Sequence, residues 1–126
     1  MGVILADLKR EDRAENCNWW NWRPTVELLR QSGLFDAERL ELMRYNAGAR
    51  VSEGEARAVA QFLEDRVLPA LRPGDRVMLD GSVTDVPDDG TLYREPAEQF
   101  KNYSANEAWL RRFAAFCREC GGFSVF

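Results

Sequence analysis

The segment SEGEARAVAQFLEDRVLP, residues 52–69, contains the signal that decides most about the fold. Ser52 is followed three residues later by Glu55, which is the spacing of a capping box, in which each side chain binds the backbone N–H of the other residue. Apolar residues then recur at helical spacing, at Ala56, Val59, Ala60, Leu63 and Val67. Pro69 disfavours helical geometry at the residue before it. The segment therefore predicts a helix over residues 53–68 with one face in the core.

Two further helices are predicted by capping residues. Ser104 and Glu107 repeat the capping-box spacing and predict a helix that ends at Gly121-Gly122, since glycine adopts the left-handed geometry that closes a helix. Asp36 predicts the cap of another helix, which continues to about Asn46. We therefore expect two capped helices besides the one over residues 53–68.

The remaining elements have weaker signals. Pro24 predicts the first turn of a shorter helix, because proline has no N–H to leave unpaired there, and Gly33 predicts its end. Strand signals are confined to three short apolar runs, Val3–Leu5, Val77–Leu79 and Phe123–Phe126. The sequence thus predicts a mostly α (α+β) fold, with about four helices packed in a single domain over residues 1–126 and a small sheet of short strands.

The composition limits the chemistry that the protein performs. The chain has 126 residues, a net charge of −4 and no histidine, so it has no imidazole for a Ser-His-Asp triad or a histidine-bearing zinc site. The negative charge argues against nucleic-acid binding, which needs a basic surface. No run of residues approaches the length of a membrane helix, about 18 apolar residues. We expect a cytoplasmic protein without a membrane partner.

Residues 73–103 form a segment that is rich in proline, glycine and carboxylates. Its net charge of −4 equals that of the whole chain, so the rest of the sequence is neutral. We expect one long acidic loop region here, in which four aspartates contact a basic partner: Asp80, Asp85, Asp88 and Asp89. Asp-Gly pairs are also ordinary turn formers, so a purely structural role stays open. The segment does not fit a calcium loop, because Asp85 stands at the sixth position, where glycine is required.

The three cysteines favour buried thiols over a metal or redox site. Cys117 and Cys120 have C-x-x-C spacing, but they lie at the end of the predicted C-terminal helix, where the helix dipole opposes a thiolate. Zinc needs four ligands, and only Cys17 remains as a third sulfur. Both C-terminal cysteines also fall on the apolar stripe of that helix. We expect reduced, buried thiols and no metal or other cofactor.

The stretch NWWNWRP, residues 18–24, is the most unusual part of the sequence, because three indoles in four residues do not all fit into a core. One interpretation buries Trp22 and one of Trp19 and Trp20 and leaves the other at the surface. A second uses Trp19 or Trp20, with Arg23, to anchor a protein partner, since tryptophan and arginine are common interface anchors. A third uses the indoles as the wall of a pocket for a ring-bearing ligand.

A weak pattern joins residues 18–24 to the closing stretch, which holds Trp109-Leu110, Phe113, Phe116-Cys117 and Gly121-Gly122-Phe123. Together they resemble small uncharacterised bacterial proteins of the kind found among the immunity proteins of polymorphic toxin systems. The resemblance covers about a third of the chain and brings no catalytic motif. It implies a non-catalytic, acidic, cytoplasmic protein that binds and blocks a partner.

Two function classes follow from these observations. The first is a non-catalytic binding protein, an immunity-type inhibitor that contacts a basic protein through the acidic loop region and an exposed tryptophan. The alternative is a small-molecule binding protein or an enzyme with a tryptophan-walled pocket, to which Trp22, Asn46 and Tyr103 contribute. We favour the first class, because no pair of carboxylates, thiols or hydroxyls in the sequence forms a catalytic set.

Overall fold

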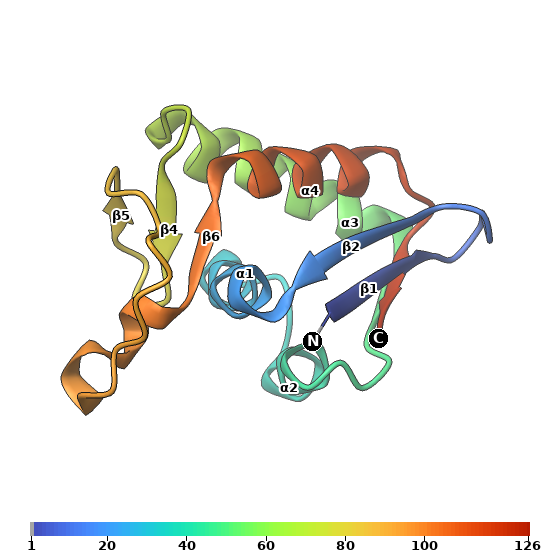
Figure 1. The fold of residues 1–126 in the computed structure, drawn as a ribbon. Helices are drawn as coiled ribbons and strands as arrows, with labels where there is room; N and C mark the ends of the chain where they lie inside the picture. Colours follow the sequence, from blue (N-terminus) through green and yellow to red (C-terminus); the bar gives the residue numbers. More distant parts are fainter. Residues whose placement is uncertain (1) are drawn as a thin grey trace.

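Helices and two antiparallel sheets make up the fold (Figure 1). The computed structural model describes residues 2–126. The helices are α1 (Trp19–Ser32), α2 (Ala37–Arg44), α3 (Glu53–Phe62) and α4 (Glu107–Glu119), with the shorter helical segments η1 (Leu63–Val67), η2 (Leu68–Ala70) and η3 (Pro96–Asn102). The strands are β1 (Gly2–Asp7), β2 (Ala14–Asn18), β3 (Arg50–Val51), β4 (Arg76–Met78), β5 (Val83–Thr84), β6 (Ser104–Asn106) and β7 (Phe123–Val125).

The two sheets lie on either side of α1, as Figure 1 shows. One has four strands in the order β2-β1-β7-β3, and the other has three strands in the order β5-β4-β6. In the three-stranded sheet, Arg76 is paired with Asn106 and Met78 with Ser104. This register puts the side chains of Arg76 and Met78 on one face of the sheet and that of Val77 on the other.

The prediction of a mostly α chain with one small sheet is wrong. Helical residues make up 48% and strand residues 19%, in two antiparallel sheets, so the fold is α+β. The three predicted strands are confirmed as parts of β1, β4 and β7, but β2, β3, β5 and β6 were missed. Three of these four have only two or three residues, too few for a period-two pattern to appear.

The acidic segment is also more ordered than a single long loop. Residues 73–103 contain β4, β5 and η3, and the longest stretch without regular structure is about residues 85–95. Side-chain-to-backbone turns add order at Asp80 and, within that stretch, at Asp88 and Asp89. Such turns depend on single Asp, Ser and Thr residues and leave no periodic pattern in the sequence.

The helix limits test the capping predictions directly. The capping box of Ser52 and Glu55 is confirmed, and Asp36 caps α2 by accepting the N–H of Arg39 at 2.8 Å. The helix expected over residues 53–68 is present as α3 and continues through the wider turn η1 into η2. Gly33 ends α1 in the left-handed conformation, with a φ of 73°. At these positions a capping side chain or a glycine determines the local backbone conformation.

Two predicted helix starts are wrong. Ser104 belongs to β6 and accepts a hydrogen bond from Arg76, and the cap of α4 is Asn106, whose Oδ1 accepts the N–H of Trp109 at 2.7 Å. Pro24 lies inside α1, which starts earlier because Asn18 Oδ1 accepts the N–H of Asn21 at 2.8 Å. In both cases a nearby asparagine is the cap.

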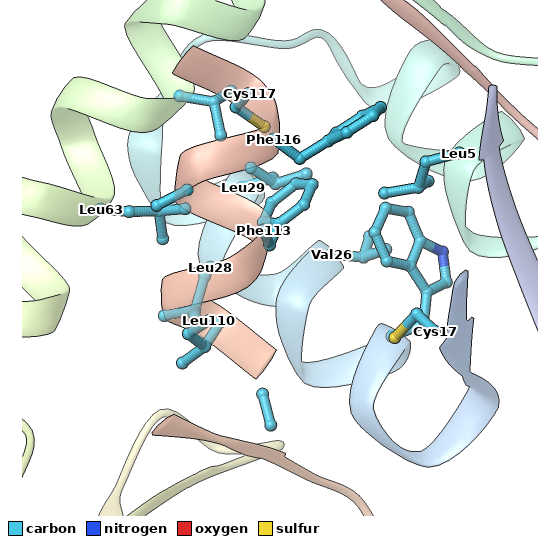
Figure 2. Packing of buried hydrophobic residues seen from close by; sticks show 14 of the residues in the cluster. Leu5, Cys17, Val26, Leu28, Leu29, Leu63, Leu110, Phe113, Phe116 and Cys117 are labelled. Atoms are coloured by element: carbon cyan, nitrogen blue, oxygen red, sulfur yellow. The ribbon is translucent and has the colours of Figure 1, made fainter. Parts of the chain in front are cut away.

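The core lies between α1, α3, α4 and the four-stranded sheet. Figure 2 shows Leu110 and Phe113 of α4 beside Leu28 and Leu29 of α1. Phe113 lies at the centre of an aromatic cluster, and its ring centroid is 5.3 Å from Trp109, 6.0 Å from Trp22 and 6.2 Å from Phe123. No helix within residues 2–126 combines the length and the apolar character that a membrane crossing demands.

Candidate functional site

A trough runs across the outer face of the three-stranded sheet, where residues 85–95 and η3 lie over it. The inner face of this sheet is core, since Val77 and Ala105 are buried. The outer face carries Arg76 and Met78 of β4 and Ser104 of β6. Two adjoining clefts make up the trough, each with a volume of about 360 Å³, and both are lined by Arg76, Pro87 and Asp88.

The tyrosine cleft is the half of the trough toward β5, and it combines apolar and charged groups. Its apolar lining comes from Met78, Tyr93 and Phe100, and its acidic rim from Asp88 and Asp89. The backbone of Tyr93 is fixed by one side chain, because Asn102 Oδ1 accepts its N–H at 2.7 Å and Asn102 Nδ2 donates to its carbonyl at 2.9 Å. The backbone that carries the ring is therefore anchored to η3.

The tryptophan cleft is the half of the trough toward α1. It is lined by Trp20 together with the polar side chains of Asn18, Asn21 and Asn106. Asn21 Oδ1 accepts the backbone N–H of Asn106 at 2.9 Å, and this bond joins the first turn of α1 to the start of α4. Trp20 directly precedes Asn21 in the same first turn of α1, so this bond helps to hold it beside the trough.

Arg76 forms the ridge between the two clefts. Its Nε and Nη2 donate to the carbonyl of Val86 at 3.0 Å and 2.7 Å, and its Nη1 donates to Ser104 Oγ at 2.9 Å. A guanidinium has five N–H groups, so two are left for other acceptors. The side chain thus ties the covering loop to β6 and still offers donors to the trough.

Three of the four predicted aspartates shape the loop through short local bonds. Asp80 Oδ1 accepts from the N–H and hydroxyl of Ser82, Asp88 Oδ1 accepts the N–H of Gly90 at 3.0 Å, and Asp89 Oδ1 accepts the N–H of Thr91 at 2.9 Å. The hydroxyl and N–H of Ser82 lower the pKa of Asp80, and the hydroxyl and N–H of Thr91 lower the pKa of Asp89, because these bonds stabilise the charged carboxylate. Both carboxylates therefore stay ionised at pH values below the usual titration range of an aspartate.

The four predicted aspartates have no ion-pair partner, although several glutamates of the chain do. Glu55 pairs with Arg39 at 2.6 Å, Glu64 with Arg118 at 2.6 Å and, within the segment itself, Glu98 with Lys101 at 3.2 Å. Within residues 2–126, the side chains of Asp80, Asp85, Asp88 and Asp89 make no ion pair, and all four are exposed. The local negative charge is thus left uncompensated at the surface.

Exposed apolar side chains accompany these charges. Val86, on the covering loop, is 60% exposed, and Val83 and Leu92 are exposed on either side of it. Trp20 is 48% exposed at the other end of the trough. Apolar groups gathered at a charged rim are a feature of protein-binding surfaces.

Of the predicted tryptophan and arginine contact residues, Trp20 lines the trough and Arg23 lies beside it, against Tyr103. Trp20 lies 5.1 Å from Tyr103, centroid to centroid, and the guanidinium of Arg23 lies 4.6 Å from the same ring. Trp19 is half-buried and packs against the core. The interpretation that buries Trp22 and one neighbour and leaves the other exposed is therefore confirmed. Asp80 and Asp85 stand apart from the trough lining, at the β4–β5 turn and after β5.

The three residues of the alternative site do not share one cavity. Trp22 is fully buried and donates from Nε1 to the carbonyl of Met43 at 2.9 Å. Asn46 follows α2, and its Nδ2 lies 3.5 Å from the carbonyl of Gly2. Tyr103 lies against Trp20, beside the trough. A pocket walled by Trp22 is therefore absent from the described part of the chain.

Sequence reasoning singled out Asp88 and Asp89 but missed the other residues that build the tyrosine cleft. Arg76 and Met78 share a face because they alternate with Val77, and this alternation was the available signal. Tyr93 and Phe100 come from a covering loop and from η3, and no local pattern places them over the sheet. Their position depends on long-range bonds such as the one between Arg76 and Val86.

The cysteines are placed in the core. Cys17, Cys117 and Cys120 are free and buried, and burial was predicted for Cys117 and Cys120. Burial raises the pKa of Cys117 and of Cys120 and raises that of Cys17 to about 12. Among residues 2–126, no group of three or more potential ligands is arranged to hold a metal ion.

Comparisons with protein-family models, with curated proteins and with solved structures found no match to this chain.

Proposed function

We propose that this protein is a non-catalytic binding protein of the immunity type, which binds a basic protein partner and blocks it. The observation that carries the proposal is the surface around the trough, where unpaired aspartates lie beside the exposed apolar side chains of Trp20 and Val86. Uncompensated charge steers a partner of opposite sign, and an apolar anchor supplies affinity once the two surfaces meet.

The packing and exposure of Trp20 support its role as the anchor. Its ring lies against Tyr103, which is in turn covered by Arg23, so the indole is already held in one place. A side chain that is ordered before binding loses less conformational freedom when the partner arrives. Trp20 is also the one exposed indole of residues 18–24, whereas Trp19 is half-buried and Trp22 is buried.

A kinetic experiment tests the proposal. An immunity protein is encoded beside its toxin, so the product of the neighbouring gene is the partner to measure. Changing Asp85, Asp88 and Asp89 together to asparagine should slow association and flatten its salt dependence, and it should leave dissociation nearly unchanged. Trp20→Ala should accelerate dissociation and weaken binding by about 30-fold, which corresponds to about 2 kcal/mol.

Matched controls separate the site from general surface effects. Glu38→Gln with Glu41→Gln removes exposed charge from α2, and Tyr45→Ala removes an exposed ring that follows the same helix. Neither control should change the kinetics. The proposal fails if the neighbouring protein and other basic proteins do not bind, or if the controls weaken binding as much as the site variants do.

The tyrosine cleft supports a second candidate function. Its volume of about 360 Å³ lies at the lower end of the range for small-ligand sites, and it combines the aromatic rings of Tyr93 and Phe100 with charged groups. The protein would then bind a small molecule instead of a protein. A ligand that raises the melting temperature, with no basic protein bound, would favour this candidate over the first.

A further inference from the structure

We propose that the trough receives an extended segment of the partner chain, in which a large apolar side chain enters the tyrosine cleft and a nearby lysine or arginine faces Asp88 and Asp89. This inference rests on the proposed function, and it adds the chemistry and the conformation of the part that is bound.

The two clefts suit a chain in extended conformation. Both adjoin the same face of β4: Arg76 lines both clefts, and Met78, two residues further along β4, lines the tyrosine cleft. Side chains of an extended segment point the same way every second residue, at intervals of about 7 Å, which is the spacing of alternate residues on β4. Residues i and i+2 of the ligand can therefore enter the two clefts in turn.

The ridge between the clefts offers groups for the ligand backbone. Arg76 uses three of its N–H groups on Val86 and Ser104, and its two remaining N–H groups are available to a carbonyl of a chain that crosses the ridge. An extended segment presents such carbonyls, whereas an α-helix keeps them within its own hydrogen bonds. The ridge thus favours an extended ligand over a helical one.

The aromatic side chains of the trough supply apolar contacts at both ends. Met78, Tyr93 and Phe100 line one cleft, and Trp20 lines the other. Grooves lined by aromatic residues are a recurring means of binding extended peptides. The backbone of Tyr93 is held at the cleft by its two bonds to Asn102.

Charge decides which extended segments fit. Asp88 and Asp89 each accept a turn N–H at Oδ1, and neither makes an ion pair. Two cations also line the tyrosine cleft, and both make bonds within the protein: Lys101 donates to Glu98 at 3.2 Å, and Arg76 donates to Val86 and Ser104. The segment that surrounds the cleft has a net charge of −4, so a lysine or arginine of the ligand at the aspartate rim is favoured over an acidic side chain.

A random peptide library displayed on phage and selected on the full-length chain is the test. Peptides of about ten residues that are enriched should carry a lysine or arginine within two positions of a large apolar residue. Synthetic copies should bind the chain, measured by fluorescence polarisation. Asp88→Asn with Asp89→Asn should weaken that binding by about tenfold, and Tyr93→Ala should weaken it by at least as much.

These variants are chosen to keep the fold. Asparagine keeps the side-chain oxygen that accepts the turn N–H, and Tyr93→Ala keeps both backbone bonds to Asn102. Glu38→Gln with Glu41→Gln is the control and should leave peptide affinity unchanged. Enriched peptides without basic residues, or binding that the site variants leave intact, would overturn the inference.

The outcomes also separate this inference from the proposed function. A folded basic protein that binds through Asp88 and Asp89, when no peptide binds, overturns the extended ligand and leaves the proposed function standing. Failure of both the protein and the peptides overturns both. Binding of a small molecule in the tyrosine cleft, in place of either, also contradicts both.

Discussion

The buried hydrogen bond between α1 and α4 gives a prediction whose size can be worked out. Trp109 Nε1 donates to Thr25 Oγ1 at 2.9 Å, and Thr25 Oγ1 donates to the carbonyl of Asn21 at 2.8 Å. Thr25 is fully buried and Trp109 is 2% exposed, so water does not reach either group. Thr25→Val keeps the shape of the side chain but leaves the indole N–H without an acceptor. A buried, unpaired donor costs about 1–3 kcal/mol.

We therefore expect Thr25→Val to lower the free energy of unfolding by about 2 kcal/mol, which corresponds to a fall in melting temperature of about 5–10 °C for a chain of this size. Thr25→Ser keeps the hydroxyl and loses one methyl group, so it should cost about 1 kcal/mol. Urea denaturation followed by far-UV circular dichroism measures both. A packing argument alone predicts the opposite order, because valine fills the site better than serine.

A double-mutant cycle isolates the bond. Trp109→Phe removes the donor, and in that background Thr25→Val should cost less than about 0.5 kcal/mol. The reasoning is refuted if Thr25→Val is as stable as the wild-type protein, or if its cost is the same with and without the indole. Either result would mean that the N–H finds another acceptor.

Three further predictions concern other parts of the fold. Asn106→Ala should destabilise by about 1 kcal/mol in urea denaturation through loss of the α4 cap, as should Ser52→Ala for α3, and an unchanged midpoint would contradict the assigned caps. Cys117 and Cys120 should react slowly with a thiol reagent at neutral pH, because burial raises their pKa, and rapid labelling without denaturant would show that they are accessible. Arg39 lowers the pKa of Glu55, so the stabilisation that Glu55 adds is present above the unfolded-state pKa of about 4.3 and is lost as pH falls through the lower folded-state pKa. The difference in stability between wild type and Glu55→Gln should therefore shrink between about pH 5 and about pH 3, and a constant difference would refute this assignment.

The sequence predicted those parts of the fold that local chemistry decides. Ser52, Asp36 and Gly33 settle the backbone at their own positions, and their predicted roles are confirmed. Ser104 shows the limit of this reasoning. Its spacing from Glu107 matches a capping box, but strand pairing with Met78 and the bond from Arg76 place it in β6. A long-range contact outweighed the local signal there.

The candidate site was predictable to a similar extent. Composition alone located the acidic segment, and the crowding of residues 18–24 indicated that one indole would remain exposed. The trough itself was not predictable, because Tyr93 and Phe100 reach it only after the loop folds back over β4. The bond that holds this loop joins Arg76 to a backbone carbonyl ten residues later, and a carbonyl has no signature in the sequence.

The order of strands in the four-stranded sheet constrains how this protein is made. β7 lies between β1 and β3, and it is synthesised after both of them. Until then β1 has only β2 beside it, and a two-stranded ribbon is marginally stable in water. The nascent chain therefore carries the apolar side chains of Val3, Leu5 and Val51 without a completed sheet to cover them. This sheet is therefore completed only once β7 has been synthesised, and until then its apolar strands are exposed to aggregation.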